Sequence, residues 1–200
     1  MNSLVLRDKL LADLHAAIFK PQGYKKKGHW ITRDLGNLTH SYYLRASRFG
    51  NSEHAIFWID VQVFSEPWHQ LVFPERPYKG PSEGPSLFSR ELGSWCSPPQ
   101  LKHEITPNTD VATLTTCLVR AAEHGAIPLL STFETPEALL RQLVVLSGSE
   151  FDLSVVGLSK LLGYEEQARE FMERAKRNAV HENDLRFLEL RERNIWRNAA

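Results

Sequence analysis

The sequence has few of the features that mark secreted or membrane-spanning proteins. Its 200 residues contain only two cysteines, Cys96 and Cys117, too few to stabilise a chain of this length by disulfides. The first twenty residues include Arg7, Lys9 and Asp13 and so lack the apolar core of a signal peptide. No apolar run approaches the roughly 20 residues that span a bilayer. We therefore expect a cytoplasmic protein with reduced thiols and no membrane partner.

A net charge is also lacking, because 24 Lys and Arg balance 24 Asp and Glu. The chain thus has no overall positive charge of the kind that dedicated nucleic-acid binders carry. The charges are unevenly spread, however. Residues 1–50 hold nine basic and three acidic side chains, whereas residues 51–200 hold fifteen basic and twenty-one acidic ones. A basic end and an acidic end favour contact with a charged partner or with a second copy.

Motifs for catalysis, metals and phosphates are missing as well. The eight histidines form no H-x-x-x-H pair, there is no C-x-x-C, and G-x-S-x-G and the glycine-rich phosphate loops are absent. Cys96 has no helix N-terminus beside it to lower its pKa. Asp60 is followed by Val61 and Gln62, where a metal-dependent nuclease would carry a lysine. We expect no cofactor and no metal, and these absences favour a protein without enzymatic activity but leave that question open.

An antiparallel sheet near the N-terminus is the clearest positive feature. A first helix, with Ser3 as its cap, is expected to end at Pro21 and Gly23. Three strand-like segments follow with short turns between them: His29–Arg33, Leu38–Ser47 and Ala55–Phe64.

The third segment alternates most clearly. Its core face is predicted to carry Phe57, Ile59, Val61 and Val63. The opposite face would then carry Ile56, Trp58, Asp60 and Gln62, with Tyr43 and Arg45 on the same side of the preceding strand.

The rest of the chain is first rich in proline and then helical. Ser65–Pro107 holds eight of the eleven prolines, which disfavours helices and central strands. A loop of this length without secondary structure would be unusual, so we expect further strands at Ser86–Leu92 and Leu101–Thr106. Helices are predicted at Asp110–His124 with Gly125 at its end, from Thr135, at Leu153–Leu162, at Glu165–Asn178 and from Glu182. This order predicts an α+β fold, with an N-terminal helix, an antiparallel sheet of about four or five strands and a C-terminal set of helices.

In the segment Phe19–Trp30 a predicted helix ends in phenylalanine, and a glycine and a tyrosine then lead into Lys25-Lys26-Lys27. This segment resembles the opening of a bacterial family known as domain of unknown function 4304. Arg90–Gly93, the apolar segment near Ile105 and the turn at 127–130 are similar to later parts of its pattern. The resemblance covers about residues 1–147 and implies an α+β domain with an antiparallel sheet. It carries no assigned activity. Residues 148–200 are expected to form a helical extension.

Two surfaces are candidates for binding. The first is the sheet face opposite the core, formed by Tyr43, Arg45, Trp58, Asp60 and Gln62, because arginine and aromatic side chains dominate binding energies at interfaces. The alternative is that helices cover this face and that Arg45 and Asp60 form an ordinary cross-strand pair.

The second surface is the run Lys25, Lys26 and Lys27. With nearby arginines it would make a basic patch, and Trp30, Tyr42 or Tyr43 would offer stacking faces for single-stranded RNA. The simpler interpretation is that these lysines solvate a loop or protect a sheet edge.

From these observations we expect a non-enzymatic protein that binds another protein, for which a toxin-immunity role is one version. RNA or single-stranded nucleic-acid binding through Lys25–Lys27 is the alternative. An unrecognised hydrolase ranks last.

Overall fold

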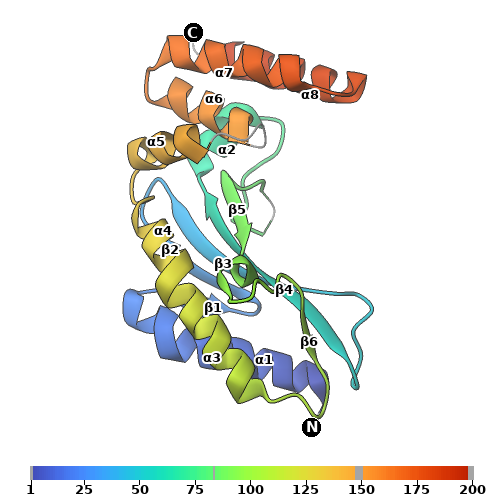
Figure 1. Ribbon diagram of the computed structural model, residues 1–200. Helices are drawn as coiled ribbons and strands as arrows, with labels where there is room; N and C mark the ends of the chain where they lie inside the picture. The colour runs from blue at the N-terminus through green and yellow to red at the C-terminus, as the bar shows by residue number, and fades with distance from the viewer. Residues whose placement is uncertain (1, 83, 147–150, 198–200) are drawn as a thin grey trace. The chain divides into compact units, whose positions relative to one another are not determined.

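The computed structural model describes residues 2–82, 84–146 and 151–197. The chain divides into two compact units. Unit 1 comprises residues 1–34, 39–63 and 89–131, and unit 2 comprises residues 35–38, 64–88 and 132–200. The order of elements, an N-terminal helix, a run of strands and then C-terminal helices, confirms the expected α+β class (Figure 1).

Six strands form one antiparallel sheet. They run in the order β1-β2-β3-β4-β5, with β6 also paired to β4. Their bounds are β1 Lys25–Lys27, β2 Trp30–Asp34, β3 Thr39–Ala46, β4 Ala55–Phe64, β5 Phe88–Glu91 and β6 His103–Ile105. The strongest predicted strand is therefore found at its expected bounds. The lysine run, expected before the first strand, is itself the edge strand.

The apolar face of the sheet holds the core of unit 1. Phe57, Ile59, Val61 and Val63 are all buried, as the alternation predicts. Tyr42 on β3 is fully buried on this face, and its ring centroid lies 4.1 Å from that of Phe19. Tyr42 is therefore not available as a stacking face for RNA.

The N-terminal helical segment ends where expected but begins with a different cap. Helix α1 (Ser3–Leu14) continues through a π-helical turn, η1 (His15–Phe19), and a 3-10 turn, η2 (Lys20–Gln22). Asn2 is the cap, because its Oδ1 accepts a hydrogen bond from Leu4 N at 2.8 Å. Ser3 is the first helical residue and is buried, so the assignment of Ser3 as the cap is wrong. Gly23 ends the segment with a φ of 83°.

The proline-rich segment contains both expected strands and a helix that was not expected. Helix α2 (Glu66–Val72) forms because Pro67 lies in its first turn, where the missing N–H costs nothing, and Ser65 caps it. A 3-10 turn, η3 (Leu92–Trp95), follows β5. Proline density thus excluded helix interiors but not a helix start.

The helix predicted to end at Gly125 continues past it. Helix α3 (Val111–Ala121) runs through η4 (Ala122–Ala126) into α4 (Ile127–Ser131), so residues 127–130 are helical and not a turn. Gly125 lies within this helix, and the position needs a glycine because a Cβ there would come within 2.2 Å of the Trp95 ring. Helices α1 and α3 pack against one another in unit 1 (Figure 1).

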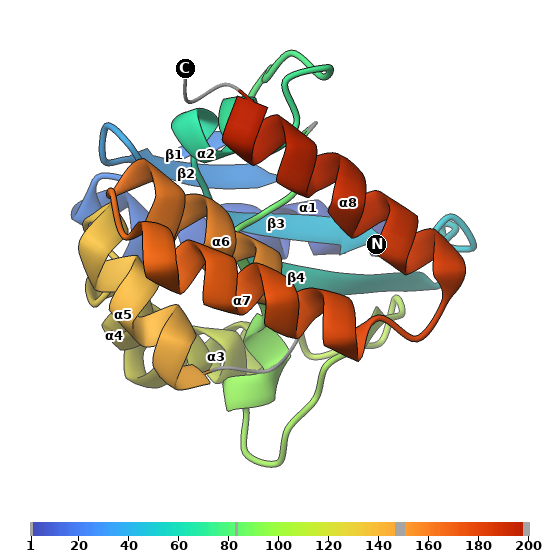
Figure 2. The same ribbon diagram turned by 90° about the horizontal axis from the view of Figure 1, so that it is seen from above.

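Unit 2 contains α2 and the helices α5 (Pro136–Leu146), α6 (Asp152–Leu161), α7 (Glu165–Asn178) and α8 (Glu182–Arg197). Figure 2 shows α6 and α7 side by side as a hairpin, joined at Gly163. Helix α2 packs against α6 and α8. Arg191 on α8 is buried and donates to the carbonyl of Val72 at 3.0 Å and to Glu75 at 2.6 Å.

The predicted domain boundary between residues 147 and 148 lies outside the described residues. Helix α5, which was assigned to the α+β domain, groups with α6, α7 and α8 in unit 2.

Candidate functional site

The sheet face opposite the core, called the outer face below, is built by the strand register. Lys27 pairs with Trp30, and Trp30 pairs with Tyr43. Directly opposed residues of antiparallel strands lie on the same face, so these three side chains form one row across β1, β2 and β3. The rings of Trp30 and Tyr43 are stacked, with centroids 4.1 Å apart and planes inclined by 17°.

Arg45 is the centre of a second group on this face, called the Arg45 cluster: Arg45, Trp58, Asp60 and Glu91. The guanidinium donates two hydrogen bonds to Asp60, from Nε to Oδ2 at 2.9 Å and from Nη2 to Oδ1 at 3.1 Å. Nη2 also donates to Glu91 Oε1 at 3.0 Å. The guanidinium carbon lies 4.7 Å from the centre of the Trp58 ring. Four side chains from β3, β4 and β5 thereby hold one another in place.

Electrostatics keep this arginine charged. The hydrogen bond to Asp60 raises the pKa of Arg45, and the charges of Asp60 and Glu91 act in the same direction. The Asp60 side chain is 10% exposed and that of Arg45 is 44% exposed. A buried carboxylate therefore anchors a cation that remains open to solvent.

The five predicted residues are only partly brought together. Arg45, Trp58 and Asp60 share the Arg45 cluster, whereas Tyr43 stacks on Trp30 instead. Gln62 is half-buried, and its Oε1 accepts no hydrogen bond from the described residues. Of the five, Asp60 is buried and Arg45 exposed, and the others are half-buried. The face is neither fully covered nor fully open.

Two residues of the site were not among the candidates. Glu91 was placed in a predicted strand, but nothing local indicates that its carboxylate reaches Arg45, 46 positions earlier in the chain. Trp30 was considered only as a stacking face for RNA. Its pairing with Tyr43 could be anticipated from the turn at Asp34–Asn37, since a hairpin fixes which residues oppose each other.

The three lysines lie at the edge of the sheet. All are exposed, and β1 has a strand neighbour on one side only. Lys25 and Lys27 share the outer face with Thr32 and Trp30, whereas Lys26 pairs with Ile31 on the core side. The run therefore does not act as one patch, because successive side chains of a strand point to opposite faces.

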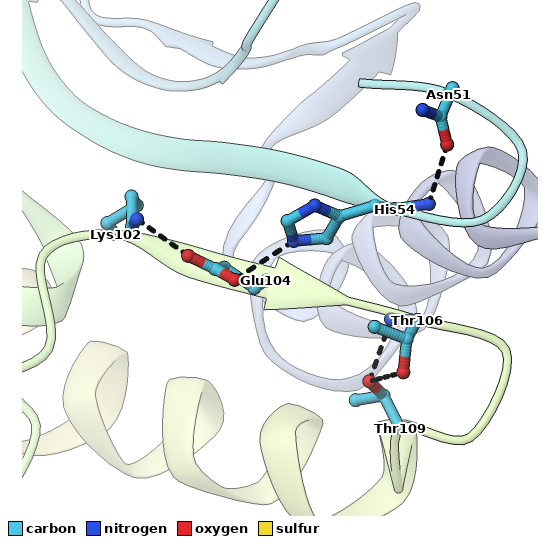
Figure 3. A network of polar contacts seen from close by, with 6 residues as sticks. All are labelled: Asn51, His54, Lys102, Glu104, Thr106 and Thr109. Atoms are coloured by element: carbon cyan, nitrogen blue, oxygen red, sulfur yellow. Dashed lines mark hydrogen bonds and ion pairs between the residues drawn. The ribbon is translucent and has the colours of Figure 1, made fainter. Parts of the chain in front are cut away.

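A third polar group lies where β6 meets β4 (Figure 3). Glu104 accepts from Lys102 Nζ at 2.6 Å and contacts His54 Nε2 at 2.9 Å. The hydrogen bond from Lys102, followed by that from His54, lowers the pKa of Glu104. Asn51 Oδ1 accepts from the backbone N–H of His54 at 2.9 Å. Figure 3 shows these contacts joining the β3–β4 turn to β6, so their role is to fix that turn.

In the described part of the chain, no three His, Cys, Asp or Glu side chains gather closely enough to hold a metal ion. Across residues 2–82, 84–146 and 151–197, no helix is long and apolar enough to cross a membrane.

Comparison with known proteins places the chain in a family without placing it near a characterised protein. No curated protein and no solved structure matches the sequence. The sequence pattern of one family, Domain of unknown function (DUF4304), matches residues 15–131, which is more than half of the chain. This range begins in η1 and ends at the last residue of α4, so it includes every strand of the sheet and the whole Arg45 cluster. The chain therefore belongs to the DUF4304 family.

Proposed function

We propose that this protein is a non-enzymatic binding module whose outer face recognises another protein. The observation that carries the proposal is the state of Arg45, which is fixed by two carboxylates and the Trp58 ring while its side chain stays 44% exposed. An arginine held in one geometry loses little conformational freedom on binding, so its contacts contribute more to affinity. Arginine and tryptophan are also the side chains most enriched at interface hot spots.

The unused donors of Arg45 indicate what the partner presents. Nε and Nη2 are occupied by Asp60 and Glu91, whereas Nη1 has no hydrogen-bond partner among the described residues. A backbone carbonyl or a hydroxyl of the partner would satisfy Nη1, and an apolar side chain would pack on the exposed part of the half-buried Trp58. A toxin held by this face is one version of such a partner.

Nucleic acid is the second candidate, because Lys25 and Lys27 lie on the same face as the Trp30–Tyr43 stack. Two features weigh against it. The Arg45 cluster carries two carboxylates against one guanidinium, which repels a phosphate backbone. The mutual stacking of Trp30 and Tyr43 also occupies one ring face of each, and single-stranded nucleic acid needs free ring faces.

Site-specific photocrosslinking tests the proposal. A benzoylphenylalanine at position 43 on the outer face is compared with one at position 49, where the exposed Phe49 on the β3–β4 turn serves as the control. In extract of the native cell we expect one protein to crosslink from position 43 and not from position 49. Equal crosslinking from both positions would contradict the proposal. Crosslinked RNA that disappears in the Lys25→Ala/Lys27→Ala variant would favour the second candidate instead.

The captured protein is then purified and its binding measured. Arg45→Ala is expected to weaken binding by roughly tenfold or more, because the loss of a hot-spot arginine costs about 2 kcal/mol of binding free energy. Arg48→Ala, an exposed arginine on the neighbouring turn, is the matched control and should leave the affinity within about twofold. An affinity that Arg45→Ala does not change would overturn the assignment of the site.

A further inference from the structure

Cys96 and Cys117 lie together at a pocket that takes no part in the proposed function. Cys96 directly follows η3, and Cys117 lies in the middle of α3, yet their sulfur atoms are 3.3 Å apart. Both are free thiols, Cys96 buried and Cys117 half-buried. They line a pocket of about 580 Å³ between the segment after η3 and the helix. A disulfide needs its sulfurs about 2 Å apart, so the two sulfur atoms lie about 1 Å beyond bonding distance.

Among the described residues, the pocket wall includes one arginine and one histidine and no carboxylate. Arg120 and His124 follow Cys117 by three and seven positions, so they lie on the same side of the helix and line the same pocket. Trp95 forms another part of the wall, and the Arg90 guanidinium carbon lies 5.2 Å from the centre of its ring. The Asp110 carboxylate before α3 is occupied, because it accepts from Thr113 Oγ1 at 2.6 Å and from backbone N–H groups of the first turn. The exposed guanidinium of Arg120 in the pocket wall therefore favours a small molecule that carries a carboxylate.

We propose that Cys96 and Cys117 form a reversible dithiol–disulfide pair that exchanges with a small anionic disulfide bound in this pocket. The Cys117 thiolate attacks one sulfur of the small disulfide and forms a mixed disulfide, and the first small thiolate leaves. Cys96 then loses its proton and attacks Cys117 Sγ, which forms the Cys96–Cys117 bond and expels the second small thiolate. The two departing thiolates take up the two protons that the cysteines release. The protein dithiol is oxidised by two electrons, and the small disulfide is reduced to two thiols.

The order of attack follows from the surroundings of the two sulfurs. Burial, together with the neighbouring Cys117 thiol, raises the pKa of Cys96 to about 12, so Cys96 keeps its proton and is a poor first nucleophile. Cys117 is the more accessible sulfur and meets the disulfide first. Cys96 is placed for the second attack, because its sulfur lies 3.3 Å from Cys117 Sγ.

The test uses the full chain and oxidised glutathione as the probe. We expect both thiols to disappear together, to give a product lighter by two hydrogen atoms that dithiothreitol restores. Cys96→Ser should stop at a mixed disulfide with glutathione, and Cys117→Ser should not react while folded. A stable mixed disulfide in the unaltered protein, a disulfide between two chains, or no loss of thiol would each overturn the proposal.

The choice of substrate is tested separately. Oxidised glutathione should react roughly tenfold faster than cystamine, a cationic disulfide of similar reactivity, at low ionic strength. Arg120→Gln should reduce this preference, whereas Arg141→Gln on α5, outside the pocket, should not. Equal rates with the two disulfides would overturn the anionic class of substrate. Circular dichroism of each variant shows whether it is folded, and the reaction of the unaltered chain needs no substitution.

Discussion

His103 on β6 is fully buried, and its ring centroid lies 5.3 Å from that of Phe57. Neither of its ring nitrogens has a hydrogen-bond partner among the described residues. Burial without a partner disfavours the charged imidazolium, which lowers the pKa of His103 from 6.5 to about 4. The ring of His103 is thus neutral in the native core of unit 1, and its protonation would destabilise that core.

This environment predicts a loss of stability in acid. In the unfolded chain His103 takes up a proton near pH 6.5, whereas in the folded chain it does so only near pH 4. Between these values the unfolded state binds more protons, so the free energy of unfolding falls as the pH is lowered, by up to about 3 kcal/mol from this residue. Urea unfolding at several pH values measures the change.

The variant His103→Gln, which has no ionisable ring, should lose less stability than the unaltered protein between pH 7 and about 4. His181→Gln, an exposed histidine before α8, is the control and should retain the acid sensitivity. If His103→Gln were as sensitive to acid as the unaltered protein, His103 would not be the group that titrates.

Single residues show how far the sequence could predict the site. Alternation along β3 and β4 was sufficient to place Arg45, Trp58 and Asp60 on one face, because the direction of a side chain in a strand depends only on its position in the strand. The contact of Arg45 with Glu91 depends on how β5 pairs with β4, which no short stretch of sequence specifies. The same holds for Cys96 and Cys117, whose proximity depends on where η3 meets α3.

Among the elements, β1 carries a prediction about association. An edge strand leaves backbone N–H and C=O groups free to pair with another chain, and lysines on such a strand oppose that pairing by charge. Changing Lys25, Lys26 and Lys27 to threonine keeps the preference for strand and removes the charge. We expect this variant to fold and to self-associate with increasing concentration, as sedimentation velocity would show.

The control removes exposed lysines that are not on a strand: Lys9→Thr on α1 together with Lys20→Thr on η2. This double variant should stay monomeric. A monomeric β1 variant would show that the lysines do not protect the edge.

Helix α6 carries a prediction about packing. An ideal Cβ on Gly157 would lie 2.3 Å from Trp68 Nε1 and 3.0 Å from Val72 Cγ2, and both side chains are buried in unit 2. Alanine is better than glycine in a helix by about 1 kcal/mol, but overpacking costs roughly 1–3 kcal/mol and here meets a ring with no room to move. Gly157→Ala should therefore destabilise the protein by about 2 kcal/mol in urea unfolding.

Glu170→Ala, on the exposed side of α7, is the control and should change stability by less than about 0.5 kcal/mol. A stabilised Gly157→Ala variant would mean that α2 and α6 do not pack as closely as the distances indicate.

At the scale of the whole molecule, the two units are interleaved along the chain. Residues 64–88 belong to unit 2, and the chain returns to unit 1 at residue 89. Three side chains of this segment, Trp68, Val72 and Phe73, are buried. They pack within unit 2 against Gly157 of α6 and Arg191 of α8. Residues 15–131, which match the family, therefore include side chains that pack against residues outside the match, among them Gly157 and Arg191.

This organisation predicts that residues 1–131 alone are not a stable monomer. Without α6 and α8 the fragment would expose Trp68, Val72 and Phe73, and exposed apolar patches promote association. We expect the fragment to bind a hydrophobic dye and to scatter light at concentrations where the full chain does neither. A monomeric fragment that unfolds cooperatively would show instead that unit 1 and the segment 64–88 are stable without the C-terminal helices.

The sequence by itself determined the fold class, the core face of β4 and most helix bounds, because periodicity, caps and prolines act within a few residues of one another. It also determined the family, through the segment around Phe19–Trp30 that leads into the lysines. Only the tertiary structure decided that those lysines form an edge strand, that Glu91 completes the Arg45 cluster and that two distant cysteines lie 3.3 Å apart. These features depend on strand pairing and packing between segments far apart in the chain, where local preferences carry no information.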